Sequence, residues 1–319
     1  MTISQPLRWL VIGVGDITSK RVLPAVLAEP RSQLVGIVTR DPAKAVRYGV
    51  PGWTSLEKAL ATSDAQAVYV ASPVFLHASH TIASLRAGRH VLCEKPMALT
   101  YADACSMHAV AQASACIFGV AYYRRMYPKV ARAQKLLSAG AIGRPVIAEA
   151  TSHDWFYPEN DSRAWLVDPR KSRGGPLNDI ACHRIDLLNY LFGQPIKASG
   201  HLSTLVHPID VEDNATVMME HESQVRSVVD VRWHSRVARD EFRIRGTEGE
   251  LDLSPLNGPR LVCNGNEESV PPPENLHYPC IENFVSAVRG EAQLRSTGAS
   301  ALQTEWVIAQ VRGLQRDVP

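Results

Sequence analysis

Two segments of the sequence combine side chains that can hold and transfer a proton. The first is Glu94-Lys95-Pro96, which directly follows a short apolar run, and the second is Gly174–His183. In the second segment Asp179 and His183 stand four residues apart, so on an α-helix they share one face and can bind one substrate together. Lysine, carboxylate and imidazole groups can orient an alcohol or carbonyl oxygen and exchange a proton with it, which suits a reaction whose hydride is carried by a cofactor.

Each of these residues also has a purely structural interpretation. Lys95 can be a solvated lysine at a strand end, and Asp179 can stabilise the N-terminus of its helix. His183 is one of 11 histidines, most of which must be ordinary surface or core residues. The peptide bond between Lys95 and Pro96 can be cis, which would fix the direction of the lysine.

A glycine-rich segment near the N-terminus predicts a dinucleotide site. It reads Gly13-Val14-Gly15-Asp16-Ile17-Thr18 and follows the apolar run Leu7–Gly13. Two glycines at this spacing permit a tight turn and a close approach of the backbone to a pyrophosphate. The N-terminus of the next helix would then point at the pyrophosphate and offer it amide donors. We therefore expect Gly13, Gly15, Asp16 and Ile17 to contact a cofactor, although Thr18 replaces the third small residue of the fingerprint.

The end of the second predicted strand bears on the choice of cofactor. Proteins selective for NAD usually carry an acidic residue here, whereas this chain has Thr39-Arg40, with Lys44 one helical turn further on. A hydroxyl, a guanidinium and an ammonium group would attract a 2′-phosphate, so the segment favours NADP over NAD. The alternative is that Arg40 and Lys44 are solvated charges at a helix start.

Residues 1–123 alternate short apolar runs with helical segments, which predicts a doubly wound parallel sheet of the Rossmann type. Thr54 and Thr100 are expected to begin two of its helices, and Pro24 to kink the first. The expected strands are Leu7–Gly13, Gln33–Thr39, Ala67–Ala71, His90–Glu94 and Cys116–Tyr122.

Residues 124–319 predict a second domain of the α+β class. Val146–Asp154 is a β-rich run, and after a helix five further runs follow one another between residues 198 and 253, with Thr247-Glu248-Gly249 typical of a hairpin turn. We expect a mostly antiparallel, open-faced sheet with helices at Pro128–Ala139, Asp179–Leu191 and two places near the C-terminus. If the open face is apolar, it needs covering, which predicts a homodimer or homotetramer.

The chain resembles the glucose–fructose oxidoreductase, inositol dehydrogenase and rhizopine-catabolism (Gfo/Idh/MocA) family over nearly its whole length. The string Ala87–Thr100 (AGRHVLCEKPMALT), with a downstream Gly-Gly and then Asp and His, is a specific signature that Rossmann proteins in general do not share. The other matching segments are Gly13–Thr18, Val68–His77, Gly140–Pro145, Gly174–Leu188 and Phe242–Leu253.

The resemblance implies roles for individual residues. Lys95 matches the catalytic lysine of the family, His183 its general acid/base, and Asp179 the carboxylate that positions substrate and histidine. Three further residues, Ser72, Pro73 and His77, match the loop along the cofactor, and Glu94 the residue beside its ribose. The chain departs from the common pattern at Pro176-Leu177, where many members have a third small residue, and at Thr39-Arg40.

A second group of residues could line a sugar or polyol pocket. It comprises His153, Arg163 and Trp165, which follow the first strand of the second domain, and Arg124, just past the last Rossmann strand. The sequence leaves open whether they bind substrate or only form a surface loop packed on the sheet.

Composition excludes several classes of partner. The chain has 319 residues, and its 34 basic and 32 acidic side chains nearly cancel, which gives no reason to expect nucleic acid or an anionic membrane as partner. No run is long enough for a membrane span, and the six scattered cysteines indicate reduced thiols in a cytoplasmic protein and no metal site.

The prediction is thus an NADP(H)-dependent oxidoreductase, with NAD possible as cofactor, acting on a secondary alcohol or ketone of a sugar, inositol or related polyol. Two alternatives belong to other classes. One is a sensor that binds NADP(H) without turnover, against which the retention of Lys95, Asp179 and His183 argues. The other is a glycosidase with a tightly held NAD. Fold resemblance cannot name the substrate.

Overall fold

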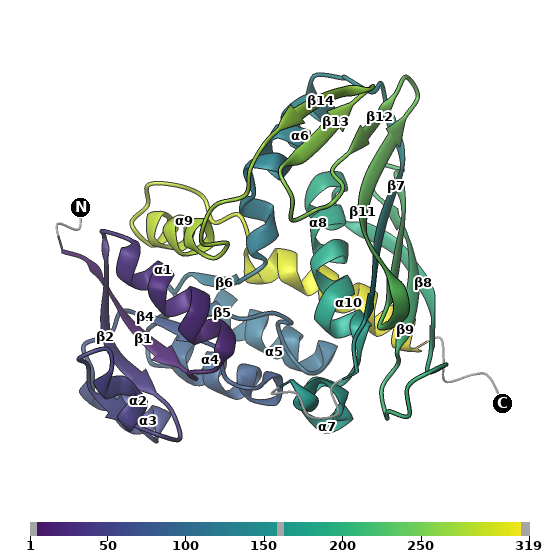
Figure 1. Cartoon of the computed structure of the whole chain (residues 1–319). Coiled ribbons are helices and arrows are strands. Elements are labelled where there is room, and N and C mark those ends of the chain that lie inside the picture. The colour runs from purple at the N-terminus through teal and green to yellow at the C-terminus, as the bar shows by residue number, and fades with distance from the viewer. Residues whose placement is uncertain (1–4, 158–162, 314–319) are drawn as a thin grey trace. The chain divides into compact units, whose positions relative to one another are not determined.

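The computed structural model describes residues 5–157 and 163–313. The chain forms two compact units, and Figure 1 colours it from the N-terminus to the C-terminus. Unit 1 comprises Met1–Tyr123 and Glu274–Leu302, and unit 2 comprises Arg124–Pro273 and Gln303–Pro319. The division after residue 123 is where the sequence places it, but the segment Glu274–Leu302 lies in unit 1 and not in the second domain.

Unit 1 contains the predicted Rossmann sheet. Its six strands are all parallel and run in the order β3-β2-β1-β4-β5-β6. The chain reverses its direction of winding between β1 and β4, and ligands bind at such a point outside the carboxyl ends of the strands. The strands are β1 (Leu7–Ile12), β2 (Ser32–Val38), β3 (Gly52–Trp53), β4 (Ala67–Val70), β5 (His90–Cys93) and β6 (Phe118–Val120).

The helices of unit 1 begin where side chains can satisfy their first amides. Thr100 is the N-cap of α5, as predicted, because its hydroxyl accepts the N–H of Asp103 at 3.0 Å. Ser55, and not Thr54, begins α3, since its hydroxyl accepts the N–H of Lys58. The helices are α1 (Leu23–Ala28), α2 (Ala43–Val46), α3 (Leu56–Thr62), α4 (His77–Arg86), α5 (Tyr101–Gln112) and α9 (Tyr278–Val288).

The irregularity expected at Pro24 is a change of helix type. A π-helical turn spans Thr18–Val22 before α1, and the N–H of Leu23 bonds to the carbonyl of Thr18, five residues back. Pro24 has no N–H to donate, so the ordinary α-helical pattern could not continue unbroken through it.

The late segment of unit 1 completes its core and covers one edge of its sheet. The ring of Trp9, which is fully buried, packs on Phe284 of α9 at 5.2 Å between centroids. At the edge strand β6, Ser296 accepts the N–H of Val120 with its carbonyl at 3.1 Å and donates its hydroxyl to the Val120 carbonyl at 2.7 Å. These contacts explain why this segment belongs to unit 1.

Unit 2 contains the second sheet, with strand order β14-β13-β12-β11-β7-β10-β9-β8. The sheet is mostly antiparallel, as predicted, and only β7 and β10 run parallel among its described strands. The strands are β7 (Pro145–Trp155), β8 (Pro195–Ser203), β9 (Asn214–His221), β10 (Arg226–Arg232), β11 (His234–Gly246), β12 (Glu250–Asp252), β13 (Arg260–Cys263) and β14 (Asn266–Ser269).

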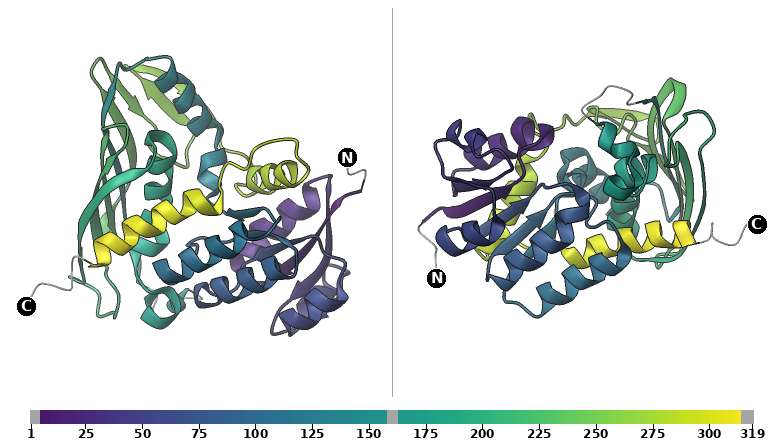
Figure 2. Two further views of the ribbon diagram at one scale, coloured as in Figure 1. Left: turned by 180° about the vertical axis from the view of Figure 1, so that it is seen from behind. Right: turned by 90° about the horizontal axis from the view of Figure 1, so that it is seen from below.

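One face of this sheet is covered by helices and the other is open. Helices α6 (Pro128–Ser138) and α8 (Cys182–Phe192) lie on the same side of it, as the views of Figure 2 show, and a short helix, α7 (Pro169–Ser172), lies near its end. Helix α10 (Gly298–Gly313) begins in unit 1 and continues in unit 2. No described helix is long and apolar enough to cross a membrane.

The open face carries both polar and apolar side chains; Met218 of β9, which pairs in register with Val228 of β10, is 54% exposed there. Ala148 and Ala150 of β7 face the helices and are buried, whereas the alternate positions Glu149, Thr151 and His153 face outward. Opposite them on β10, Asp230 pairs in register with Thr151. The homodimer or homotetramer stays a prediction.

Candidate active site

The glycine loop after β1 has the form that a bound pyrophosphate requires. Gly13 has φ of 89°, and a Cβ there would collide with the carbonyl oxygen of Ala71, so this position admits only glycine. Its N–H donates to Val38 at 2.8 Å. Gly15 is exposed and nothing lies within 4 Å of where its Cβ would be. The loop is thus closed towards the sheet and open at Gly15, which fits a dinucleotide.

The three residues that follow Gly15 differ in exposure and charge. Asp16 is exposed and its carboxylate pairs with Lys20 at 2.7 Å, so the acid is partly neutralised. Ile17 is 44% exposed. Thr18, at the third fingerprint position, is buried and enters the π-helical turn.

One basic side chain, that of Lys44, contacts this loop. The Nζ atom of Lys44 donates to the carbonyl of Val14 at 3.4 Å, which places its ammonium group at the glycine loop. Arg40 is exposed, and Thr39 donates its N–H to Trp53 at 2.8 Å. The nearest carboxylate in the sequence, Asp41, accepts the N–H of Ala43 at the start of α2. Arg40 and Lys44 are thus exposed basic residues that follow β2.

His77 holds two loops together and does not line an open surface. It is 1% exposed; its Nε2 lies 2.8 Å from the carbonyl of Ser72, and its Nδ1 lies 2.9 Å from that of Pro96. Burial lowers the pKa of His77, although these carbonyls oppose the shift. The histidine thus joins the exposed Pro73 and its neighbour Ser72, after β4, to the turn after β5 that carries Lys95.

Glu94 is surrounded by protein groups. Its carboxylate accepts the hydroxyl of Tyr69 at 2.7 Å and the N–H of Lys95 at 3.1 Å, and Nε2 of His277 lies 3.4 Å away. Burial alone would raise the pKa of Glu94, but His277, Tyr69 and the charge of Lys95 lower it to about 2. The carboxylate therefore anchors the backbone of Lys95, and the Lys95–Pro96 peptide bond is cis.

Sequence reasoning missed two residues of this cluster. Tyr69 lies inside an apolar strand, and His277 belongs to the segment that was expected in the other domain. His277 also packs on the ring of Tyr123 at 4.4 Å between centroids. Tyr69 stands in the matching segment Val68–His77, but no signal in the sequence connected it or His277 with Glu94.

In unit 2, Asp179 and His183 lie on either side of a change in helix type. Asp179 is half-buried in a π-helical turn, Leu177–Ala181, and His183 lies buried in the first turn of α8. The prediction assumed a regular α-helix over both residues, so their relative direction follows from the π turn instead. Single π turns within α-helices occur frequently at functional sites.

The glycines before this turn serve packing inside unit 2. A Cβ on Gly174 would collide with the guanidinium of Arg312, and one on Gly175 with the carbonyl oxygen of Glu212. From the sequence, these glycines were expected to bring the helix N-terminus close to a substrate. The structure shows that they bring it close to Glu212 and Arg312.

The predicted pocket residues are dispersed. His153 lies on the open face of the sheet, where Nε2 contacts Asp230 at 2.6 Å, whereas α8 covers the other face. It is therefore not close to His183 and cannot share a pocket with it. Arg163 packs over the ring of Phe156 at 4.4 Å, and Trp165 is 39% exposed.

Arg124 lies near α8. Burial and the neighbouring positive charge of Arg124 lower the pKa of Arg184 to about 10, although its partner Asp240, at 2.9 Å, opposes the shift. Arg184 directly follows His183 in the sequence. Arg124 thus lies beside the helix of the candidate acid/base.

Comparisons with known families and proteins identify this arrangement. Residues 7–122 match the model of the oxidoreductase family with an NAD-binding Rossmann fold, and residues 130–252 match the Gfo/Idh/MocA C-terminal domain. The chain belongs to the Gfo/Idh/MocA family. It is therefore an NAD(P)-dependent oxidoreductase, and the resemblance inferred from the sequence motifs is confirmed.

Relatives and solved structures extend this result. The chain is 29% identical to 1,5-anhydro-D-fructose reductase of Ensifer adhaerens over 95% of this chain and 93% of the relative. It is 30% identical to levoglucosan dehydrogenase of Pseudarthrobacter phenanthrenivorans, over 71% of this chain and 63% of that protein.

Solved structures share the fold at lower identity. The WlbA dehydrogenase of Bordetella pertussis, in complex with NADH and UDP-GlcNAcA, has a TM-score of 0.87 at 22% identity, covering 98% of this chain and 96% of that one. A levoglucosan dehydrogenase complex with NADH and levoglucosan has a TM-score of 0.86 at 24% identity, with 97% of each chain covered.

Proposed function

We propose that this oxidoreductase uses NADP(H) to interconvert a ketone and a secondary alcohol on a sugar or a related polyhydroxylated compound. The observation that carries the cofactor preference is the position of Lys44, whose ammonium lies 3.4 Å from the carbonyl of Val14 in the glycine loop. The substrate class is supported by the similarity to a reductase of 1,5-anhydro-D-fructose and a dehydrogenase of levoglucosan.

The preference for NADP rests on charge. Arg40 and Lys44 are both exposed, so neither is committed to the core and both can contact a 2′-phosphate. The carboxylate of Asp41, which would repel such a phosphate, is engaged with the N–H of Ala43 at 3.1 Å.

The protein's own residues would handle the proton. When bound, the nicotinamide supplies or accepts the hydride. In the reducing direction, Lys95 donates a hydrogen bond to the carbonyl oxygen, and His183 delivers the proton that completes the alcohol. In the oxidising direction His183 takes that proton back. Asp179 positions the imidazole and the substrate, and the bonds of Glu94 and His77 fix the turn that carries Lys95.

Cofactor titration tests the proposal first. NADPH and NADH are titrated by tryptophan fluorescence or calorimetry into the wild type and the variants Arg40→Ala and Lys44→Ala. Each lost charge-assisted contact to the phosphate would weaken NADPH binding about tenfold or more and leave NADH binding unchanged. Lys58→Ala, which removes an exposed charge on α3 of the same unit, is the matched control and keeps the affinity for NADPH.

The activity assay follows NADPH consumption with keto-sugars, beginning with 1,5-anhydro-D-fructose. Tighter NADPH binding that both variants abolish, together with turnover of a keto-sugar, supports the proposal. Equal binding, or tighter binding of NADH, contradicts the role given to Arg40 and Lys44. Failure to bind either cofactor contradicts the proposed function as a whole.

A further inference from the structure

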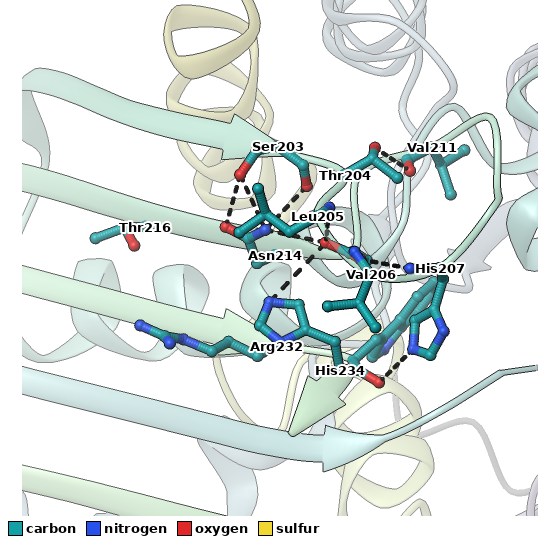
Figure 3. Close-up of polar contacts among 12 residues, drawn as sticks. Ser203, Thr204, Leu205, Val206, His207, Val211, Asn214, Thr216, Arg232 and His234 are labelled. Carbon is teal, nitrogen blue, oxygen red and sulfur yellow. Dashed lines mark hydrogen bonds and ion pairs between the residues drawn. The ribbon is translucent and has the colours of Figure 1, made fainter. Parts of the chain in front are cut away.

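The connection between β8 and β9 is folded around one buried carboxylate, that of Asp213. This carboxylate is fully buried and accepts hydrogen bonds of 2.8–3.0 Å from three consecutive backbone amides and from the side chain of Asn214. Figure 3 shows these contacts at the ends of the strands. The three amides are those of Leu205, Val206 and His207. Because all these donors bond to the one carboxylate, the backbone conformation of residues 204–213 is fixed.

This path directs the neighbouring side chain of Glu212 at the π turn that carries Asp179. The Oε1 atom of Glu212 accepts the N–H of Leu177, the first residue of that turn, at 3.2 Å. Arg312 of α10 lies 3.4 Å from both oxygens of Glu212 and also donates to Oδ1 of Asn178 at 3.1 Å. The side chain of Glu212 is 5% exposed and that of Arg312 is 22% exposed.

The Gly-Gly pair before the turn makes this approach possible. Any side chain at Gly174 would occupy the place of the Arg312 guanidinium, and any side chain at Gly175 would occupy the place of the Glu212 carbonyl oxygen. Glu212 thus acts as the acceptor that the first residues of a helix lack, although it comes from a distant part of the chain. A carboxylate at a helix N-terminus is also favoured by the helix dipole.

We propose that Glu212, held by Arg312, is a positioning residue of the active site, which fixes the π turn and thereby the relative directions of Asp179 and His183. This inference rests on the proposed function only for the roles of those two residues. Without Glu212 the N–H of Leu177 is left unsatisfied in a buried place. A return of the turn to an α-helix would change the direction of Asp179 relative to His183, because the two kinds of helix turn by different angles per residue.

The test compares three variants. Glu212→Ala removes the acceptor, Glu212→Gln keeps an oxygen at the position of Oε1, and Leu261→Ala creates a cavity in β13, at the other end of the sheet. Leu261 is fully buried, so its loss destabilises unit 2 without touching the turn. Hydrogen exchange of residues 177–183 and the NMR signal of the His183 ring, assigned with His183→Gln, report on the turn without requiring turnover.

In Glu212→Ala we expect faster exchange at residues 177–181 and a His183 ring signal that moves or splits. Glu212→Gln should restore both towards wild type, and Leu261→Ala should change neither. With 1,5-anhydro-D-fructose and NADPH, kcat of Glu212→Ala should fall about 10- to 100-fold, as for a slightly misplaced catalytic group, at an unchanged KM for NADPH.

Two results overturn the inference. The first is that Glu212→Ala changes neither the hydrogen exchange of residues 177–181 nor the His183 ring signal. The second is that Glu212→Ala and Leu261→Ala change these two quantities equally. If the wild type turns over no keto-sugar but the exchange and the His183 signal respond as expected, only the proposed function fails, and the positioning of the turn by Glu212 stands.

Discussion

Glu94 shows how much a single side chain can depend on residues that are distant in the sequence. The family resemblance implied that it lies beside the cofactor ribose. In the structure its carboxylate accepts hydrogen bonds from the hydroxyl of Tyr69 in β4 and from the backbone N–H of Lys95, and it lies near the ring of His277. The type of residue was therefore recognisable from the motif, whereas its partners were not, because no local pattern links residue 277 to residue 94.

The ionisation of Glu94 predicts a pH-dependent stability. Because the fold lowers its pKa from 4.5 to about 2, the charged form stabilises the native state at neutral pH, and this contribution is lost as the pH falls towards 2. Glu94→Gln should cost about 2 kcal/mol at pH 7, the size of a hydrogen bond to a charged group, and less at pH 3. Urea unfolding at the two pH values measures the difference.

Glu57→Gln, an exposed carboxylate on α3, is the control and should change stability little at either pH. A cost of Glu94→Gln that grows on acidification would contradict the assignment, because the sign of the linkage would then be reversed.

At the scale of elements, the sequence patterns located most strands and helices within a few residues. Apolar runs predicted five strands of unit 1, but the two-residue strand β3 was too short to produce a pattern. The sequence pattern predicted the N-cap of α5 at Thr100 correctly. It predicted the N-cap of α3 at Thr54, one residue before the actual N-cap, Ser55. The π turn at Leu177–Ala181 could not be predicted, since its acceptor at Glu212 is a tertiary contact.

The cap of α5 gives a prediction at this scale. The Thr100 hydroxyl accepts the N–H of Asp103 and donates to its carboxylate at 2.6 Å, so Thr100→Ala should lower the free energy of unfolding by about 1 kcal/mol. Ser106→Ala, inside the same helix and exposed, removes only a bond to the Ala102 carbonyl and should be nearly neutral. Equal losses in thermal unfolding would show that the cap contributes nothing.

At the scale of the molecule, the chain returns to unit 1 after building most of unit 2. Helical periodicity predicted α9 but not the sheet on which it packs. The full burial of Trp9 against Phe284 and the bonds of Ser296 to Val120 decide that unit 1 is incomplete without residues 274–302.

Phe284→Ala tests this assignment. The substitution removes a fully buried ring and should destabilise unit 1 by about 3–5 kcal/mol. We expect hydrogen exchange to accelerate in β1 and β6, while β9 and β10 of unit 2 keep wild-type exchange. Acceleration confined to β9 and β10 would place the segment with the second unit after all.

The sequence by itself determined the family, the two kinds of sheet and the residue types that carry the chemistry, because glycine spacing, apolar runs and the Glu94-Lys95-Pro96 motif are local features. Tertiary structure alone decided that His77 and Glu94 hold loops in place, that His153 lies on the open face, and that Glu212 reaches the turn of Asp179. These facts depend on contacts between residues far apart in the chain, and such contacts leave no periodicity or spacing in a single sequence.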